Sequence, residues 1–156
     1  MSRYLATTNS VALPEGFWPD LGEGIGAIAL YAVVGVVLML IGFYAIDFTT
    51  PGKLSDLVRG GRPNAVVVTA SGMLSMAFII VIAIFGSTGD LAAGLIQSVV
   101  FGLVGIIAQV LAVRLLEWTT RLDVGSTIES EKFAPASLVV AAVHVALGLV
   151  VAAAVL

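Results

Sequence analysis

The chain has 156 residues, of which 60% are hydrophobic and 11% are charged. Ordinary soluble domains carry roughly a quarter charged residues, and a small globule cannot hide so much apolar surface from water. The composition therefore excludes a soluble enzyme or a nucleic-acid-binding domain. With seven Lys and Arg, no Cys and one His, the sequence offers no basic surface for nucleic acid and no ligand set for a metal or haem. We therefore expect no nucleic-acid partner and no cofactor.

The first 25 residues do not resemble a conventional signal peptide, because no basic region followed by an apolar core and a cleavage site is present. The segment from Leu13 to Pro19 is instead expected to be kinked. Its aromatic pair, Phe17 and Trp18, is expected to rest at the outer headgroup level. We interpret 1–25 as an extracytoplasmic, interfacial segment, with a docking arm for a periplasmic or membrane partner as the alternative.

Four stretches without charged residues follow, each long enough to cross a bilayer, which takes about 20 apolar residues. They are continuously apolar rather than alternating, which favours helices over a barrel. The predicted helices cover 26–46, 65–85, 91–116 and 137–156. The predicted fold class is therefore an all-α membrane protein with four transmembrane helices.

The basic residues gather in two of the predicted connections. The first connection contains Lys53, Arg59 and Arg62, and the region between the third and fourth helices contains Arg114, Arg121 and Lys132. Basic residues favour the cytoplasmic side of a membrane protein. We therefore expect these connections inside the cytoplasm and both termini outside it.

An internal repeat organises the four helices. The segment from Ile46 to Thr50 recurs as Leu116 to Thr120, and each copy has an acid, an aromatic and two threonines where an apolar helix is expected to end. In each copy another apolar helix begins after a short polar connection. The sequence therefore predicts two tandem two-helix hairpins, 26–90 and 91–156, with the same orientation in the membrane.

The two polar connections are expected to contain short interfacial helices. In the first, Thr50 is the expected N-cap and Pro51 the first helical residue. In the second, Ser126 and Glu129 have the spacing of a capping box. Apolar residues follow the first cap at helical spacing: Leu54, Leu57 and Val58.

Small residues recur at spacings of three and four on the third and fourth predicted helices, which lets helix backbones approach closely in lipid. They are expected to pack the helices within one bundle, or to form contacts between subunits. The candidates are Gly94, Ser98, Gly102, Gly105, Ala141, Gly148 and Ala152.

His144 is the one ionisable side chain well inside a predicted span. Such a residue is a functional candidate, although a neutral imidazole can also simply hydrogen-bond to a neighbouring helix. The alternatives are a proton or ligand role, or a cofactor or metal shared between subunits. A serine–histidine dyad with Ser71 is disfavoured, because no oxyanion-hole donor set is evident. The other polar residues expected inside the membrane are Ser71, Ser75, Gln97 and Gln109.

Asp47 and Glu117 are equivalent acids in the two repeats, placed where helices reach the cytoplasmic interface. An acid at a helix C-terminus is unfavourable. We therefore expect each to cap the next short helix or to pair with a nearby arginine, with a symmetric cation site as the sharper alternative. Asn64 is expected to cap the second predicted helix or to hydrogen-bond across the repeat.

The string from Asp47 to Leu54, followed by an Asn-Ala start to an apolar helix, resembles a family of bacterial inner-membrane proteins catalogued as domain of unknown function 350. The resemblance covers 26–156 and implies a small plasma-membrane protein of paired two-helix repeats, without an assigned activity. The second copy departs from the pattern, with Glu117 for Asp, Arg121 in place of Pro51, and Pro135 where an Asn is expected. The matching positions are Asp47, Thr50, Pro51, Asn64, Ala65, Glu117, Thr120 and Gly148.

Taken together, these features favour a non-enzymatic membrane protein, embedded in the lipid bilayer of a bacterial plasma membrane. It is expected to form homo-oligomers or to act as an accessory subunit of a larger membrane complex. A small oligomeric channel or transporter is the alternative. Gln97 and Gln109 are about 120° apart around a helix, which counts against a pore lined by that helix alone.

Overall fold

A computed structural model describes 13–49, 53–86 and 90–156, and the described residues are all helical or irregular, without strands. Four helices are long and apolar enough to cross a membrane, which confirms the predicted class. They are α1 (Phe17–Thr49), α3 (Pro63–Phe85), α4 (Leu91–Thr120) and α6 (Ala136–Val155), and two short helices, α2 (Leu54–Arg59) and α5 (Val124–Glu129), lie between them in the chain.

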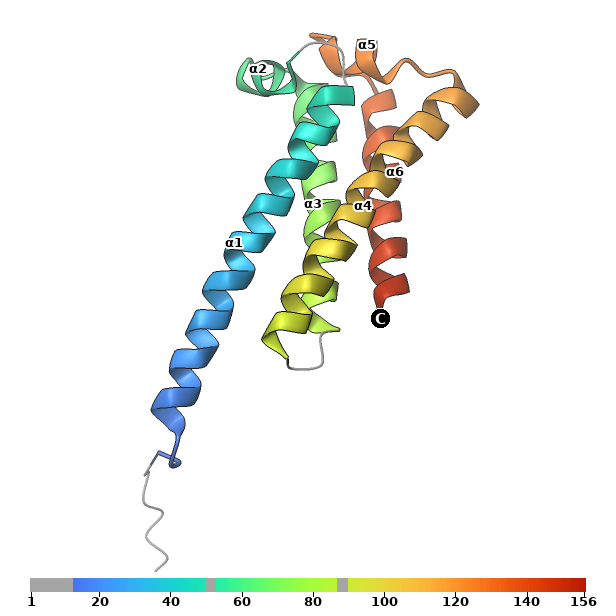
Figure 1. The fold of residues 1–156 in the computed structure, drawn as a ribbon. Coiled ribbons are helices and arrows are strands. Elements are labelled where there is room, and N and C mark those ends of the chain that lie inside the picture. Colours follow the sequence, from blue (N-terminus) through green and yellow to red (C-terminus); the bar gives the residue numbers. More distant parts are fainter. Residues whose placement is uncertain (1–12, 50–52, 87–89) are drawn as a thin grey trace, which may run out of the picture.

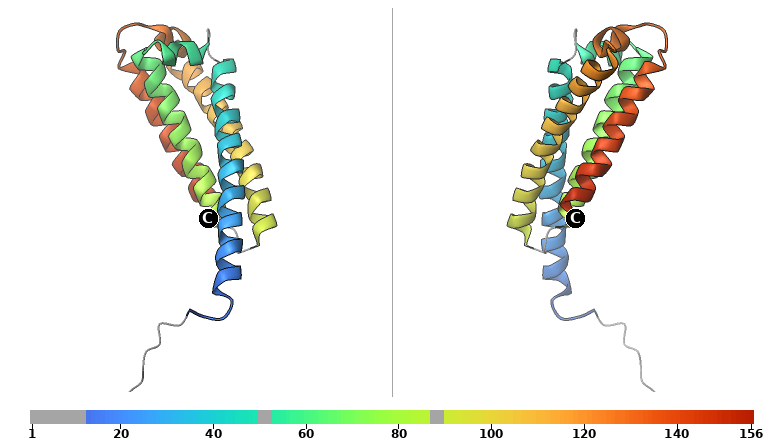
Figure 2. Two further views of the ribbon diagram at one scale, coloured as in Figure 1. Left: turned by 90° about the vertical axis from the view of Figure 1, so that its left-hand side faces the viewer. Right: turned by 90° about the vertical axis from the view of Figure 1, so that its right-hand side faces the viewer.

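The four long helices form a bundle in which α3 is the central member. Half of the apolar stretch of α3 is buried, compared with 6% of that of α1. Both short helices lie at one end of the bundle, and the start of α1 and the C-terminus lie at the other (Figure 1). The side views show that the first turns of α1 extend beyond the rest of the bundle (Figure 2). The helix α1 is therefore the peripheral element.

The predicted start of the first helix, at residue 26, is wrong because α1 begins at Phe17. Gly16 adopts a left-handed turn with φ of 92°, and the Phe17 N–H donates to the Pro14 carbonyl. Pro19 is tolerated because it falls in the first helical turn, where no N–H is needed. The proposed boundary at residue 25 therefore falls within a continuous helix.

The predicted ends of the two long helices are also wrong, because α1 and α4 continue into the repeated motif instead of stopping before it. The helix α4 runs through Glu117 to Thr120. The Thr120 hydroxyl donates to the Leu116 carbonyl, 2.6 Å away, so threonine here supports the last helical turn. The helix ends at Thr120, and the next residue, Arg121, is left-handed with φ of 57°.

Both short helices are present as predicted, but their caps differ. The N-cap of α2 is Lys53, which makes no side-chain capping bond, while the expected Thr50 and Pro51 lie outside the described residues. In α5 the cap is Asp123, whose carboxylate accepts from the Ser126 N–H. Ser126 and Glu129 therefore lie inside α5 and form no capping box.

Two clusters of buried apolar side chains hold the bundle together. One lies beneath the short helices and contains Leu54, Ala65, Val68, Val124, Ile128 and Val140. The other lies among the long helices and contains Leu38, Met76, Ile79, Ile80 and Ile106. A helix of six residues is too short to be stable by itself. The first cluster stabilises α2 and α5 because their apolar side chains are buried in it.

The order of elements is the same in both halves of the chain, with a long helix, a six-residue helix and a shorter spanning helix in each. This order is compatible with the tandem repeat, which stays a prediction. So does the orientation of the termini, although the start of α1 and the C-terminus do lie at one end of the bundle (Figure 1).

Candidate functional site

The small residues of α4 and α6 pack against neighbouring helices of the same chain. A Cβ atom added at Gly102 would lie 2.7 Å from a methyl carbon of Leu38, and one at Gly148 would lie 2.9 Å from the Ser75 Cα. A larger residue at Gly102 would require the Leu38 side chain to move, and one at Gly148 would require the α3 backbone to move. Gly94, Ser98, Gly102, Gly105, Gly148 and Ala152 are buried, and Ala141 is half-buried. The buried members of both stripes are therefore covered by neighbouring helices of the same chain.

A chain of hydrogen bonds crosses the middle of the bundle from α4 through α3 to α6. The Gln109 side-chain N–H donates to the Ser75 hydroxyl at 2.8 Å. The Ser75 hydroxyl in turn donates to the His144 backbone carbonyl at 2.7 Å. All three residues are buried, so these bonds satisfy polar groups that would otherwise be costly in an apolar interior.

The His144 ring lies against Ser71, with 3.3 Å between Nδ1 and the hydroxyl oxygen. The single hydroxyl hydrogen of Ser71 is donated to the Val68 carbonyl at 2.8 Å. The Ser71 oxygen can therefore only accept from the ring, which assigns the hydrogen of the neutral imidazole to Nδ1. This direction is the reverse of a catalytic serine–histidine dyad, in which the serine donates to the ring.

Gly72 makes room for the ring and was not singled out from the sequence. A Cβ atom at this position would lie 3.4 Å from the His144 Nδ1 and 2.7 Å from a methyl carbon of Ile46. The sequence did contain an indication of this contact. A glycine in the middle of an apolar helix is destabilising, so its presence suggests that a neighbouring group approaches the helix closely there.

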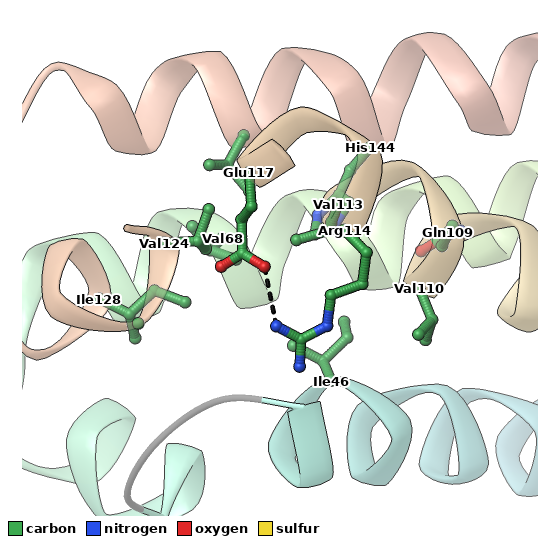
Figure 3. A pocket seen from close by; sticks show the side chains of 12 residues that line it. Ile46, Val68, Gln109, Val110, Val113, Arg114, Glu117, Val124, Ile128 and His144 are labelled. Carbon is green, nitrogen blue, oxygen red and sulfur yellow. Dashed lines mark hydrogen bonds and ion pairs between the residues drawn. The ribbon is translucent and has the colours of Figure 1, made fainter. Parts of the chain in front are cut away.

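His144 and Gln109 also line a small pocket toward the α2/α5 end of the bundle (Figure 3). The cavity volume is about 20 Å³. Five of the six helices contribute to the wall, and most of the lining side chains are aliphatic. The lining residues are Ile46, Val68, Gln109, Val110, Val113, Arg114, Glu117, Val124, Gly125, Ile128, Val140 and His144.

An ion pair belongs to the same pocket. The Arg114 guanidinium lies 2.7 Å from the Glu117 carboxylate, and the two side chains are 53% and 23% exposed. Figure 3 shows this pair beside the aliphatic wall. The pocket therefore combines two buried polar side chains with one partly exposed ion pair.

The two equivalent acids of the repeat have different partners. The Asp47 carboxylate accepts a hydrogen bond from the Leu54 N–H at the start of α2, whereas Glu117 pairs with Arg114 within α4. Asp47 thus caps the next short helix and Glu117 pairs with a nearby arginine, so each acid has one of the two expected roles. The described residues contain no group of three or more His, Cys, Asp or Glu side chains that could hold a metal ion.

Asn64 bonds across the two halves of the chain and does not cap its own helix. Its side-chain N–H groups donate to the carbonyls of Ser130 and Lys132 at 3.2 and 2.8 Å. Its side-chain oxygen accepts from the Ala134 N–H at 2.8 Å. Asn64 therefore fixes the connection between α5 and α6 to the start of α3, and Arg62 adds an ion pair with Glu131 at 2.8 Å.

The other polar candidates take no part in this pocket. Gln97 is half-buried, three turns of α4 away from Gln109, and Thr120 bonds only within its own helix end and to the next connection. Thr50 and Pro51 lie outside the described residues. The structure thus brings together Ser71, Ser75, Gln109 and His144, and adds Arg114 and Glu117 to them.

Four long apolar helices around an internal polar cluster define a polytopic α-helical membrane protein. A family model described as Domain of Unknown Function (DUF350) matches residues 20–155, and the chain belongs to this family.

Relatives with curated names are all called UPF0719 transmembrane protein. The one from Mycolicibacterium paratuberculosis (strain ATCC BAA-968 / K-10) is 38% identical over 134 residues, covering 85% of this chain and 89% of the relative. Those from Mycobacterium bovis (strain ATCC BAA-935 / AF2122/97) and Mycobacterium tuberculosis (strain CDC 1551 / Oshkosh) are each 40% identical over 81 residues, covering 51% of this chain and 53% of each relative. No solved structure matches the chain.

Proposed function

We propose that this protein is a non-enzymatic membrane protein that self-associates, and that it serves as a structural or accessory subunit of a larger membrane assembly. The observation that carries the proposal is the outer face of α1. The glycine stripes of α4 and α6 are covered within the chain, so the proposed contact lies on the helix that the bundle covers least.

The outer face of α1 is lined by small and β-branched residues: Gly22, Gly26, Ala29 and Val33. They follow one another at spacings of four, three and four, and all are exposed. Ala29 is nine residues from Leu38, which packs into the bundle. At 3.6 residues per turn, nine residues place the two on opposite sides of the helix. This face is therefore turned away from the bundle, with the small-residue spacing that favours close helix pairing in lipid.

The glycines of this segment have no explanation within the chain. A Cβ atom at Gly22, Gly24 or Gly26 would meet nothing within 4 Å, in contrast to the buried glycines of the bundle. Each helical glycine costs about 1 kcal/mol relative to alanine. At Gly22 and Gly26, which lie on the outer face, close approach of another α1 backbone from a second copy of the chain would offset this cost.

Cysteine crosslinking in membranes tests the proposal, because the sequence contains no cysteine. We expect Ala29→Cys to form disulfide-linked dimers on mild oxidation, and Gly26→Leu in the same chain to reduce them severalfold. Ala154→Cys, on an exposed position of α6, is the matched control and should stay monomeric. Equal yields from the two single-cysteine variants would contradict a specific α1 contact.

We also propose that the protein resides in a bacterial plasma membrane with both termini outside the cytoplasm. The support is the placement of charged residues. The α2/α5 end carries the basic residues Lys53, Arg59, Arg121 and Lys132, all exposed, and basic residues favour the cytoplasmic side. The acids of the α1 start, such as Asp20, lie at the opposite end (Figure 1).

A small channel or transporter is the second candidate, favoured by the connected polar group of Gln109, Ser75, His144 and Ser71. Two observations weigh against it for a single chain. Gln97 does not join this group, and the buried hydroxyl of Ser98 is bonded to the Gly94 carbonyl of its own helix. Ion flux through liposomes containing the purified protein would favour this candidate over the first.

A further inference from the structure

The pocket beside His144 presents two hydrogen-bond acceptors that no described residue fills. The hydrogen bond to Ser71 leaves Nε2 of the neutral imidazole as an acceptor. Gln109 donates to Ser75 through its amide nitrogen, which leaves its amide oxygen as the second acceptor. No described residue donates to either atom, although His144 is 1% and Gln109 3% exposed.

The volume of the cavity and the two acceptor atoms both suit one water molecule. A cavity of about 20 Å³ exceeds the roughly 10–15 Å³ that a single water requires, and a buried water needs two to four polar partners. A water molecule has two hydrogens to donate, one for each acceptor.

The pocket also has a charged end that is partly exposed. Arg114 and Glu117 line the same pocket, and their side chains are partly exposed toward the α2/α5 end. They are the only charged groups among the lining residues, since those from α1, α3 and α5 are aliphatic side chains and Gly125. Glu117 is therefore the one acid among the lining residues that could balance an imidazolium formed at His144.

We propose that this pocket is a binding site for one water molecule, which donates to His144 Nε2 and Gln109 Oε1 and delivers protons to the imidazole from the Arg114–Glu117 end. In the transfer, an O–H bond of the water breaks and an N–H bond forms at Nε2. The water regains a proton from solvent at the charged end, so the ring gains one positive charge and the water is unchanged. This inference goes beyond the proposed self-association and does not depend on it.

His144 is the single histidine of the chain, so selective isotope labelling of histidine gives one imidazole to observe. The protein, purified through a tag without histidine, is placed in lipid nanodiscs and examined by nitrogen-15 magnetic resonance. We expect a neutral ring with hydrogen on Nδ1, magnetisation transfer from water to the ring, and reversible protonation of Nε2 as the pH is lowered.

Val113→Phe fills the pocket from its aliphatic wall, and it should abolish both the water transfer and the protonation. Val104→Phe is the matched control, because it makes the same change on an exposed position of α4. It should leave both signals unchanged. If Val113→Phe does not fold, judged by its amide spectrum, Gln109→Leu replaces it and should reduce the water transfer severalfold.

Two results would overturn the proposal. One is a parent protein whose imidazole shows no transfer from water or carries its hydrogen on Nε2. The other is a folded Val113→Phe protein with the water transfer of the parent, because water would then reach the ring by another route. Crosslinking through Ala29→Cys reports separately on self-association, so failure of either proposal is recognised independently.

Discussion

Asn64→Ala is expected to be among the most destabilising polar substitutions in this protein. Asn64 is fully buried and makes three hydrogen bonds to the connection between α5 and α6. At about 1 kcal/mol net for each bond, its removal costs roughly 3 kcal/mol, and any partner left buried without a bond adds to this. The folding equilibrium should fall by about a hundredfold.

Asn64→Asp separates the hydrogen bonds from the volume of the side chain. Aspartate has nearly the same shape and keeps an acceptor for the Ala134 N–H, but it turns two donors into an acceptor facing the carbonyls of Ser130 and Lys132. Because like partial charges then face one another, this variant should be at least as unstable as Asn64→Ala.

Reversible unfolding in detergent micelles, followed by circular dichroism, measures the free energy of unfolding of both variants. Thr119→Ala is the control, because it removes an exposed hydroxyl bonded within its own helix, and it should change the free energy by no more than about 0.5 kcal/mol. An Asn64→Ala protein within the same 0.5 kcal/mol of the parent would refute the reasoning.

The remaining predictions concern one glycine contact and one helix cap. Gly148→Ala should lower the free energy of unfolding by about 1–3 kcal/mol, because its Cβ would meet the Ser75 Cα at 2.9 Å. Gly24→Ala has open space around it and should be neutral or stabilising by up to about 1 kcal/mol. An equal loss of stability in both variants would contradict this interpretation. Asp47→Ala should lower the free energy by about 1 kcal/mol and accelerate hydrogen exchange at the Leu54 amide. Unchanged exchange at that amide would show that the carboxylate does not hold the start of α2.

The spans were predictable because each depends on local composition. A charge-free run of about 20 residues must be helical in lipid whatever its neighbours are, and three of the four predicted helices begin within two residues of the observed ones. The predicted start of the first helix is too late because the charge-free run begins only after Asp20 and Glu23, whereas α1 begins at Phe17. Charged residues end a membrane span, but they do not end a helix.

The residues of the polar site could be predicted from the sequence, but the hydrogen bonds between them could not. Ser71, Ser75, Gln109 and His144 stood out because polar residues are rare in such spans. Which atom bonds to which depends on the rotation and depth of three helices, and small differences in helix packing decide both. The pairing of Arg114 with Glu117 was within reach of sequence, since residues three apart share a helix face, but their place in the wall of the His144 pocket was not.

Hydrophobicity and charge act over a few turns at a time, so the sequence is enough to predict an α-helical membrane protein with four spans and two short connecting helices. How the small residues are used depends on the packing of the whole bundle. Gly102 and Gly148 are covered within the chain, while Gly26 is left open. The physical reason is that a glycine permits close approach without specifying the partner, and the partner is fixed by how all four helices pack together.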